Sequence, residues 1–236
     1  MKFYEDLLKL RNQDYASYLT IVLMRASLRD LLTPLFCLAT EIRRIPFVTS
    51  EFTGLMRLRW WQDQILAQQQ GKDVHDLIHK LPPLTPWERL KAILQGHEFF
   101  LEIRSLHASH EVYDLSQRTD IPLLHLAYTT LSPSIITSKD EQILNQIGLV
   151  LTASHLYLQR VKLTERGFNL KVSNQNLMEL IKENLPETFT PFTRWLAPFS
   201  GYGKALYCEF QKDRKPSLLT LQRHMIWAYI SSRVKF

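Results

Sequence analysis

The residues most able to do chemistry lie where carboxylates or arginines recur at helical spacing. Glu41 is followed by Arg43 and Arg44 at the end of an apolar segment. Glu98 and Glu102 stand four residues apart, so on a helix they would share one face and could hold a divalent cation through oxygen ligands. A solvated helix face explains this pair about as well. Their meaning therefore depends on the elements that carry them.

The two arginines admit two interpretations. They end a stripe of apolar residues spaced three or four apart, which predicts a helix with one buried face. A solvated helix end is the simpler interpretation of Arg43 and Arg44. The alternative is direct anion binding, because guanidinium holds phosphate in a bidentate manner without a metal. The apolar stripe consists of Leu35, Leu38, Ile42 and Ile45.

Three other motifs carry weaker signals. His75 and His79 also stand four apart, but the HEXXH pattern is absent and prolines follow, which favours a loop with exposed histidines. The GYGK run at 201–204 lacks the spacing of a phosphate-binding loop. Cys37 and Cys208 are far apart in the sequence, which predicts reduced thiols rather than a metal or redox motif.

The composition predicts one domain over residues 1–236. The chain is 45% apolar and has only seven glycines, and no linker-like stretch divides it. The sequence has no run of about 18 apolar residues, so it predicts no membrane span. The N-terminus has no secretory or transit pattern, so we expect a cytoplasmic protein. The net charge of +6 is scattered, which favours a diphosphate or an acidic lipid surface over nucleic acid as a partner.

Apolar residues recur at helical spacing along almost the whole chain, and no alternation of period two interrupts them. The sequence therefore predicts an all-α fold. We expect Pro34 to kink the second helix or to mark its first turn, Pro46 to end that helix, and Gly71 to follow the third. The expected helices span residues 14–23, 28–45, 51–70, 87–106, 115–131, 139–161, 175–183, 189–210 and 217–234.

The order of these segments resembles the squalene/phytoene synthase family. The most specific segment is EFTGLMRLRWWQDQI at residues 51–65, which is similar to the family's pattern of an arginine, two tryptophans and an acid. Arg29 and Glu41 fit the helix that precedes this pattern. TDIPLLHLAYTTLS at 119–132 and QIGLVLTASHLYLQRVKLTERGFNL at 146–170 resemble two later blocks. The residues that match the first pattern are Arg57, Leu58, Trp60, Trp61 and Asp63.

The resemblance implies an isoprenoid-synthase-type helical bundle around a central apolar pocket. In active members, acids on two facing helices hold Mg²⁺, which activates the diphosphate leaving group of a prenyl substrate. This chain departs from the family pattern in both acidic motifs, and only Arg166 keeps the family residue in the second. The residues at the departing positions are Arg43 and Arg44 in the first motif and His155, Leu158, Gln159 and Lys162 in the second.

These departures favour a non-catalytic protein that binds a prenyl diphosphate or another lipid and needs no metal or cofactor. A divergent branch, the mitochondrial complex I assembly factor and its bacterial relatives, also lacks the full set of acids. The resemblance to that branch adds respiratory-complex subunits and the surface of the inner membrane as candidate partners. Two alternatives stay open: a prenyl transferase using Mg²⁺ held by Glu41, Glu98 and Glu102, and a helical scaffold without a ligand.

Several of the candidates have a structural interpretation beside the functional one. Trp60 and Trp61 should face different sides of their helix, so at least one packs in the core. Tyr15 and Tyr128 are expected in the core, and a buried histidine is the favoured interpretation of His155. The residues expected to line a pocket or to bind an anion are Glu41, Arg43, Arg44, Arg57, Trp61, Glu98, Glu102, His155, Gln159 and Arg166.

Overall fold

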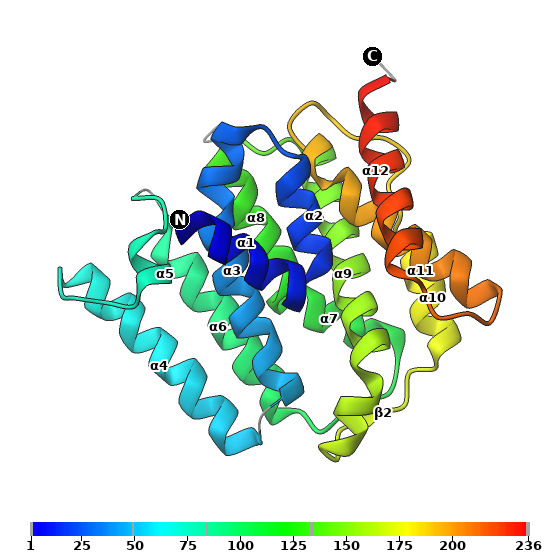
Figure 1. The fold of residues 1–236 in the computed structure, drawn as a ribbon. Coiled ribbons are helices and arrows are strands. Elements are labelled where there is room, and N and C mark those ends of the chain that lie inside the picture. Colours follow the sequence, from blue (N-terminus) through cyan, green and yellow to red (C-terminus); the bar gives the residue numbers. More distant parts are fainter. Residues whose placement is uncertain (1, 49, 84, 133–134, 235–236) are drawn as a thin grey trace.

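Helices account for most of the structure, a computed structural model that describes residues 2–48, 50–83, 85–132 and 135–234 (Figure 1). The predicted all-α fold is confirmed. A 3₁₀ turn, η1, covers Arg194–Leu196, and two short strands are β1 (Ser105–Leu106) and β2 (Asn169–Leu170). The α-helices are α1 (Lys2–Gln13), α2 (Tyr15–Leu23), α3 (Ala26–Val48), α4 (Glu51–Gln69), α5 (Asp76–His79), α6 (Trp87–Glu102), α7 (Ser109–Arg118), α8 (Asp120–Leu131), α9 (Ser138–Glu165), α10 (Asn174–Glu183), α11 (Ala197–Gln211) and α12 (Leu218–Val234).

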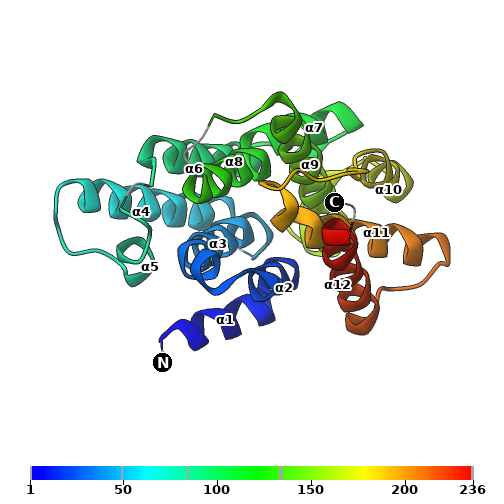
Figure 2. The ribbon, with the colours of Figure 1, turned by 90° about the horizontal axis from the view of Figure 1, so that it is seen from above.

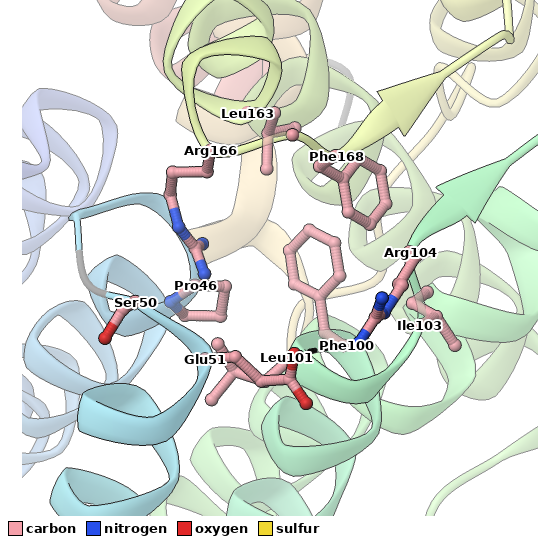
Figure 3. A pocket seen from close by; sticks show the side chains of 11 residues that line it. Pro46, Ser50, Glu51, Phe100, Leu101, Ile103, Arg104, Leu163, Arg166 and Phe168 are labelled. Atoms are coloured by element: carbon pink, nitrogen blue, oxygen red, sulfur yellow. Dashed lines mark ion pairs between the residues drawn. The ribbon is translucent and has the colours of Figure 1, made fainter.

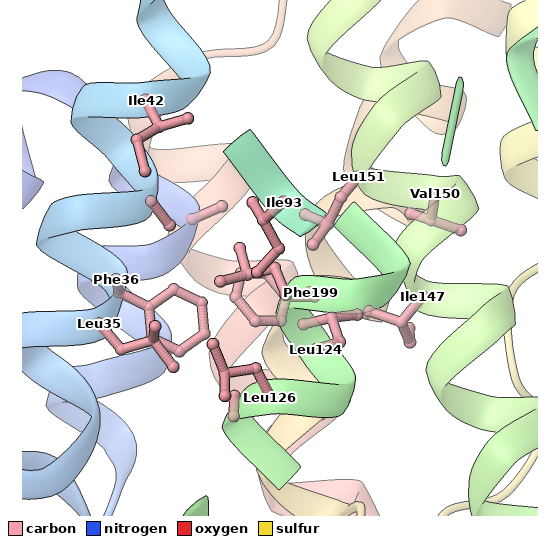
Figure 4. Packing of buried hydrophobic residues seen from close by; sticks show 14 of the residues in the cluster. Leu35, Phe36, Ile42, Ile93, Leu124, Leu126, Ile147, Val150, Leu151 and Phe199 are labelled. Carbon is pink, nitrogen blue, oxygen red and sulfur yellow. The ribbon is translucent and has the colours of Figure 1, made fainter. Parts of the chain in front are cut away.

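Helix α3 lies in the middle of the bundle, with α1 and α2 on one side and α6 and α8 on the other (Figure 2). It also contacts α4, α5 and α9. The predicted apolar stripe is buried, and additional faces of α3 are buried too because neighbours surround it. Figure 4 shows how α3, α6, α8, α9 and α11 contribute side chains to one core, including Phe36, Ile93, Leu124, Leu151 and Phe199.

Two predicted helix boundaries are wrong, one at Pro46 and one at Thr119. Helix α3 continues past Pro46 and also contains Pro34. Each proline removes one backbone donor, but buried packing on several sides of α3 stabilises the helix through both positions. The single helix expected over 115–131 is two helices, because the backbone breaks at Thr119 (φ −121°, ψ −82°). This break makes Asp120 the first residue of α8.

Other boundaries also differ. The helix expected over 189–210 begins only at Ala197, after the turn η1, and α1 and α5 were not predicted. Helix α6 ends at Glu102, and the residues expected to extend it form β1, which pairs in parallel with β2. Helix α9 runs on to Glu165 and is capped by Thr137, whose Oγ1 accepts from the backbone of Asp140 at 3.1 Å. Gly71 follows α4 with φ +68°, as predicted. In the described part of the chain, every helix is too short or too polar to cross a membrane.

Candidate functional site

A charged cluster of Asp14, Arg43 and Asp120 lies in the centre of the bundle. The guanidinium of Arg43 donates from Nη1 to Asp14 Oδ2 at 2.5 Å, and from Nε and Nη2 to Asp120 Oδ1 at 3.1 and 2.8 Å. Arg43 is 6% exposed, so these bonds form away from solvent. The cluster therefore joins α3 to α8 and to the residue that begins α2.

Both carboxylates are positioned at helix N-termini. Asp14 caps α2, accepting from the backbone of Ser17 at 3.0 Å and from its hydroxyl at 2.7 Å. Asp120 starts α8 after the break at Thr119 and also accepts from Thr152 Oγ1 at 2.8 Å. The partial positive charge of each helix N-terminus favours an ionised acid there. These local contacts fix the two acids that face Arg43.

The ionised forms of all three groups are favoured. Burial alone would raise the pKa values of Asp14 and Asp120, but the charge of Arg43 and the hydrogen bonds to the carboxylates outweigh it and lower both. Burial would likewise lower the pKa of Arg43, and the facing carboxylates raise it instead. The cluster is therefore a desolvated ion-pair network, which is costly to disrupt at one member.

The placement of Arg43 corrects both sequence-based interpretations of that residue. It is buried, so it is not a solvated helix end, and its donors are bonded to carboxylates, so they are not presented to an anion. Its neighbours Glu41 and Arg44 are half-buried. Asp14, Asp120 and the buried His97 were missed because a helical period cannot identify partners from distant segments.

An inner cavity of about 20 Å³ adjoins the charged cluster. His155 lies there with Nδ1 3.7 Å from Asp120 Oδ2, which is longer than a hydrogen bond. His97 also lines the cavity, and burial lowers its pKa to about 4, so it is neutral at pH 7. A cavity of this size holds about one water molecule. The core of the described residues is packed with buried apolar side chains, among them Phe36, Leu124 and Phe199.

The acids beside Arg43 do not suit a divalent cation. Asp14 and Asp120 already accept from the guanidinium, and its positive charge would repel a metal placed between them. Glu98 accepts from Gln62 Nε2 at 2.8 Å, and Glu102 is exposed. Within the described ranges, no group of three or more His, Cys, Asp or Glu side chains is arranged to hold a metal ion.

An outer pocket of about 620 Å³ opens between the C-terminal ends of α3, α6 and α9 and the start of α4 (Figure 3). Its walls are largely apolar, and two arginines and one glutamate supply charge. The volume falls in the range of small-molecule sites. The lining residues are Pro46, Ser50, Glu51, Phe100, Leu101, Ile103, Arg104, Leu163, Arg166, Gly167 and Phe168.

Arg104 and Arg166 reach this pocket from different elements. Arg104 Nη2 is 3.8 Å from Glu51 Oε2, a loose and mostly exposed ion pair. Burial lowers the pKa of Arg166, and its buried Nε has no hydrogen-bond partner among the described residues. A guanidinium remains charged even so. The outer pocket therefore combines two cationic groups with an apolar wall.

Phe100 lies between the outer pocket and the inner cavity, because it lines both. It packs edge-on against Phe47 and Phe168, each with ring centroids 5.6 Å away. The pairing of β1 with β2 holds this region together, since Asn169 donates to the Arg104 carbonyl at 2.8 Å. Phe100 is thus the partition between the apolar-walled pocket and the charged cluster.

The remaining candidates lie apart from these two spaces. Trp61 is buried and Trp60 is 44% exposed, so one of the two packs in the core as predicted. Their rings pack edge-on with centroids 4.7 Å apart and both contact His75, so the expectation that they face different sides of α4 is wrong. Arg57 is exposed and Gln159 is half-buried. Of the ten candidates, the structure places Arg43 and His155 at the inner cavity and Arg166 at the outer pocket.

Other sequence-based expectations have mixed outcomes. His75 does not lie in a plain loop: it caps the short helix α5, with Nδ1 accepting from Leu77 at 3.2 Å, and His79 ends that helix. Cys37 and Cys208 are free thiols, as predicted, and burial raises the pKa of Cys37 to about 12. Tyr128 is in the core, where its hydroxyl donates to Asp140 at 3.1 Å.

Comparison of the chain with models of known protein families and with curated proteins finds no match.

Proposed function

We propose that this protein is a non-catalytic relative of the squalene/phytoene synthases, whose outer pocket binds an anionic lipid such as a prenyl diphosphate. The observation that carries the proposal is the pairing of Arg104 and Arg166 with an apolar wall in one pocket of about 620 Å³. A prenyl chain would bury apolar surface against Phe100, Leu101 and Phe168. Its acidic headgroup would meet the two guanidinium groups.

The absence of catalysis is proposed from the charges at the first acidic motif. The resemblance expects metal-binding acids near Arg43, and there the guanidinium is bonded to Asp14 and Asp120 instead. Releasing a diphosphate leaving group through Mg²⁺ requires carboxylates that are available to the metal. The carboxylates beside Arg43 are committed to the ion-pair network, so binding without turnover is the function that these contacts support.

The test is native mass spectrometry of the purified protein, followed by extraction and identification of any bound lipid. We expect an acidic lipid to accompany the wild type. Ile103→Trp would fill part of the outer pocket and should lower the bound fraction. Ile135→Trp is the matched control, because Ile135 is 93% exposed and lies outside the pocket. Equal occupancy in both variants would contradict the proposed site.

A turnover assay separates the proposal from the prenyl transferase alternative. Farnesyl and geranylgeranyl diphosphate are incubated with the protein and Mg²⁺, and diphosphate release is measured. We expect no release above background. Catalytic release that is lost in Glu98→Gln but kept in Arg57→Gln would overturn the non-catalytic assignment. A folded protein that carries no lipid and binds neither diphosphate would favour the scaffold alternative.

A further inference from the structure

A second pocket lies at the opposite end of the bundle from the outer pocket. Its volume is about 510 Å³, and it shares no residue with the outer pocket. Helix α3 runs between the two ends, so they are roughly 30 Å apart. We call it the arginine pocket, and its lining residues are Met24, Arg25, Leu28, Leu131, Ser132, Pro191, Phe192, Arg194, Trp195, Tyr229 and Arg233.

The arginine pocket is rich in positive charge. Arg25, Arg194 and Arg233 all line it, and the described lining includes no aspartate or glutamate. Three guanidinium groups around one space match the charge of a phosphate or diphosphate better than that of a single carboxylate. The outer pocket differs in this respect, since Glu51 stands beside Arg104 there.

A buried hydrogen-bond donor of Trp195 is a second observation that points to a ligand in the arginine pocket. Trp195 lines the pocket and is 7% exposed, and its indole Nε1 has no hydrogen-bond partner among the described residues. Trp195 packs edge-on against Phe36, with ring centroids 6.4 Å apart, which fixes the indole in the core. An unbonded buried donor is costly, and a ligand oxygen that accepted from it would remove that cost.

The cationic groups are held on ordered elements. The carbonyl of Arg25 accepts from Leu28 and Arg29, so Arg25 forms part of the first turn of α3. Arg29 Nη2 donates to the Met24 carbonyl at 3.1 Å and stiffens the connection from α2. On α12, the Arg233 guanidinium lies 4.4 Å from the ring centroid of Tyr229 and bonds its hydroxyl. These restraints reduce the entropy lost on binding.

We propose that the arginine pocket is a second binding site, separate from the outer pocket, for an organic phosphate with an apolar body. The phosphate oxygens would accept from the guanidinium groups and from the Trp195 indole. The apolar body would contact Met24, Leu28 and Leu131, which line the same space. This inference does not depend on the function proposed for the outer pocket.

The test is a titration with 1-naphthyl phosphate, with 1-naphthol as the uncharged control. Binding is measured by calorimetry, and the Trp195 indole N–H signal is followed by NMR after assignment with Trp195→Phe. The double variant Arg25→Gln/Arg233→Gln should bind about tenfold more weakly or worse. Both arginines are exposed, so this variant should fold normally, as a thermal melt would verify.

Arg166→Gln is the matched control, because it changes the outer pocket alone. The proposal requires that the indole signal shift downfield on binding and that the affinity read from this signal be the same in Arg166→Gln and in the wild type. Equal affinity of the double variant and wild type at the indole signal, a weaker affinity at this signal in Arg166→Gln, or no shift at millimolar concentration would each overturn it. Vesicles containing phosphatidate, tested in parallel, distinguish a lipid headgroup from a free organic phosphate as the source of the anion.

Discussion

The charged cluster and the outer pocket use arginine in opposite ways. In the cluster, Arg43 is enclosed and bonded by two carboxylates, so its charge is neutralised inside the protein. In the outer pocket, the buried Nε of Arg166 has no hydrogen-bond partner among the described residues, and Glu51 is the one acid in the described lining. An arginine near an expected anion site therefore indicates binding only when its partners are known.

The largest expected effect comes from removing Arg43. Arg43→Met would leave Asp14 and Asp120 buried without their counter-ion and should lower the free energy of unfolding by about 4 kcal/mol. Urea denaturation measures this change. Replacing all three members, in Arg43→Met/Asp14→Asn/Asp120→Asn, should recover part of the loss. Arg57→Met, on an exposed face, is the control and should change stability by less than about 0.5 kcal/mol.

The next largest loss of stability should come from replacing Phe100, which lies between the outer pocket and the inner cavity beside the charged cluster. Phe100→Ala would remove the ring that lines both spaces and should lower the free energy of unfolding by about 3 to 4 kcal/mol. It should also admit water to the charged cluster, which faster hydrogen exchange in the first turn of α8 would report. A loss of stability without faster exchange there would show that Phe100 does not separate the two spaces.

A third prediction uses the pH dependence of stability. The folded state keeps His97 neutral down to about pH 4, whereas the unfolded chain takes up that proton near pH 6.5. The protonation of His97 should therefore lower the free energy of unfolding by about 3 kcal/mol as the pH drops from about 6.5 to about 4. Subtracting the curve of His97→Gln isolates the effect, since His125 and His224 titrate alike in both proteins. Parallel stability curves of the wild type and His97→Gln would contradict the lowered pKa of His97.

The lowered pKa values of Asp14 and Asp120 predict a further loss of stability at lower pH. Both are lowered in the folded state, so their stabilising contribution is complete above the pKa of the unfolded carboxyl groups, near pH 4. It is lost as the pH falls through the folded-state values. Asp120→Asn should flatten the acid limb of the stability curve as well as destabilise the protein at pH 7.

The smallest expected effect is that of Arg166 on stability. Arg166→Gln should change the free energy of unfolding by less than about 0.5 kcal/mol, because no carboxylate is hydrogen-bonded to this guanidinium among the described residues. Thermal and urea denaturation check it. A loss comparable to that of Arg43→Met would show that Arg166 also has a structural role and would remove the contrast between the two regions.

The sequence predicts most of this fold and little of its centre. Apolar spacing predicts most of the helices, and Gly71 marks the end of α4 because glycine adopts its positive φ without strain. The break at Thr119 was missed because the apolar period continues across it. The bond from Arg43 to Asp120 joins residues 77 positions apart, and no local pattern contains such a partner. The N-cap position of Asp14 before α2 is the one feature of the cluster that the local sequence could have indicated.

We propose that Arg166 lets the outer pocket bind an acidic lipid without a metal. The most direct measurement is a calorimetric titration of the wild type and Arg166→Gln with geranylgeranyl diphosphate in EDTA. We predict binding by the wild type and about tenfold weaker binding by the variant. Binding that requires Mg²⁺, or equal affinity of the two proteins in EDTA, would contradict the claim.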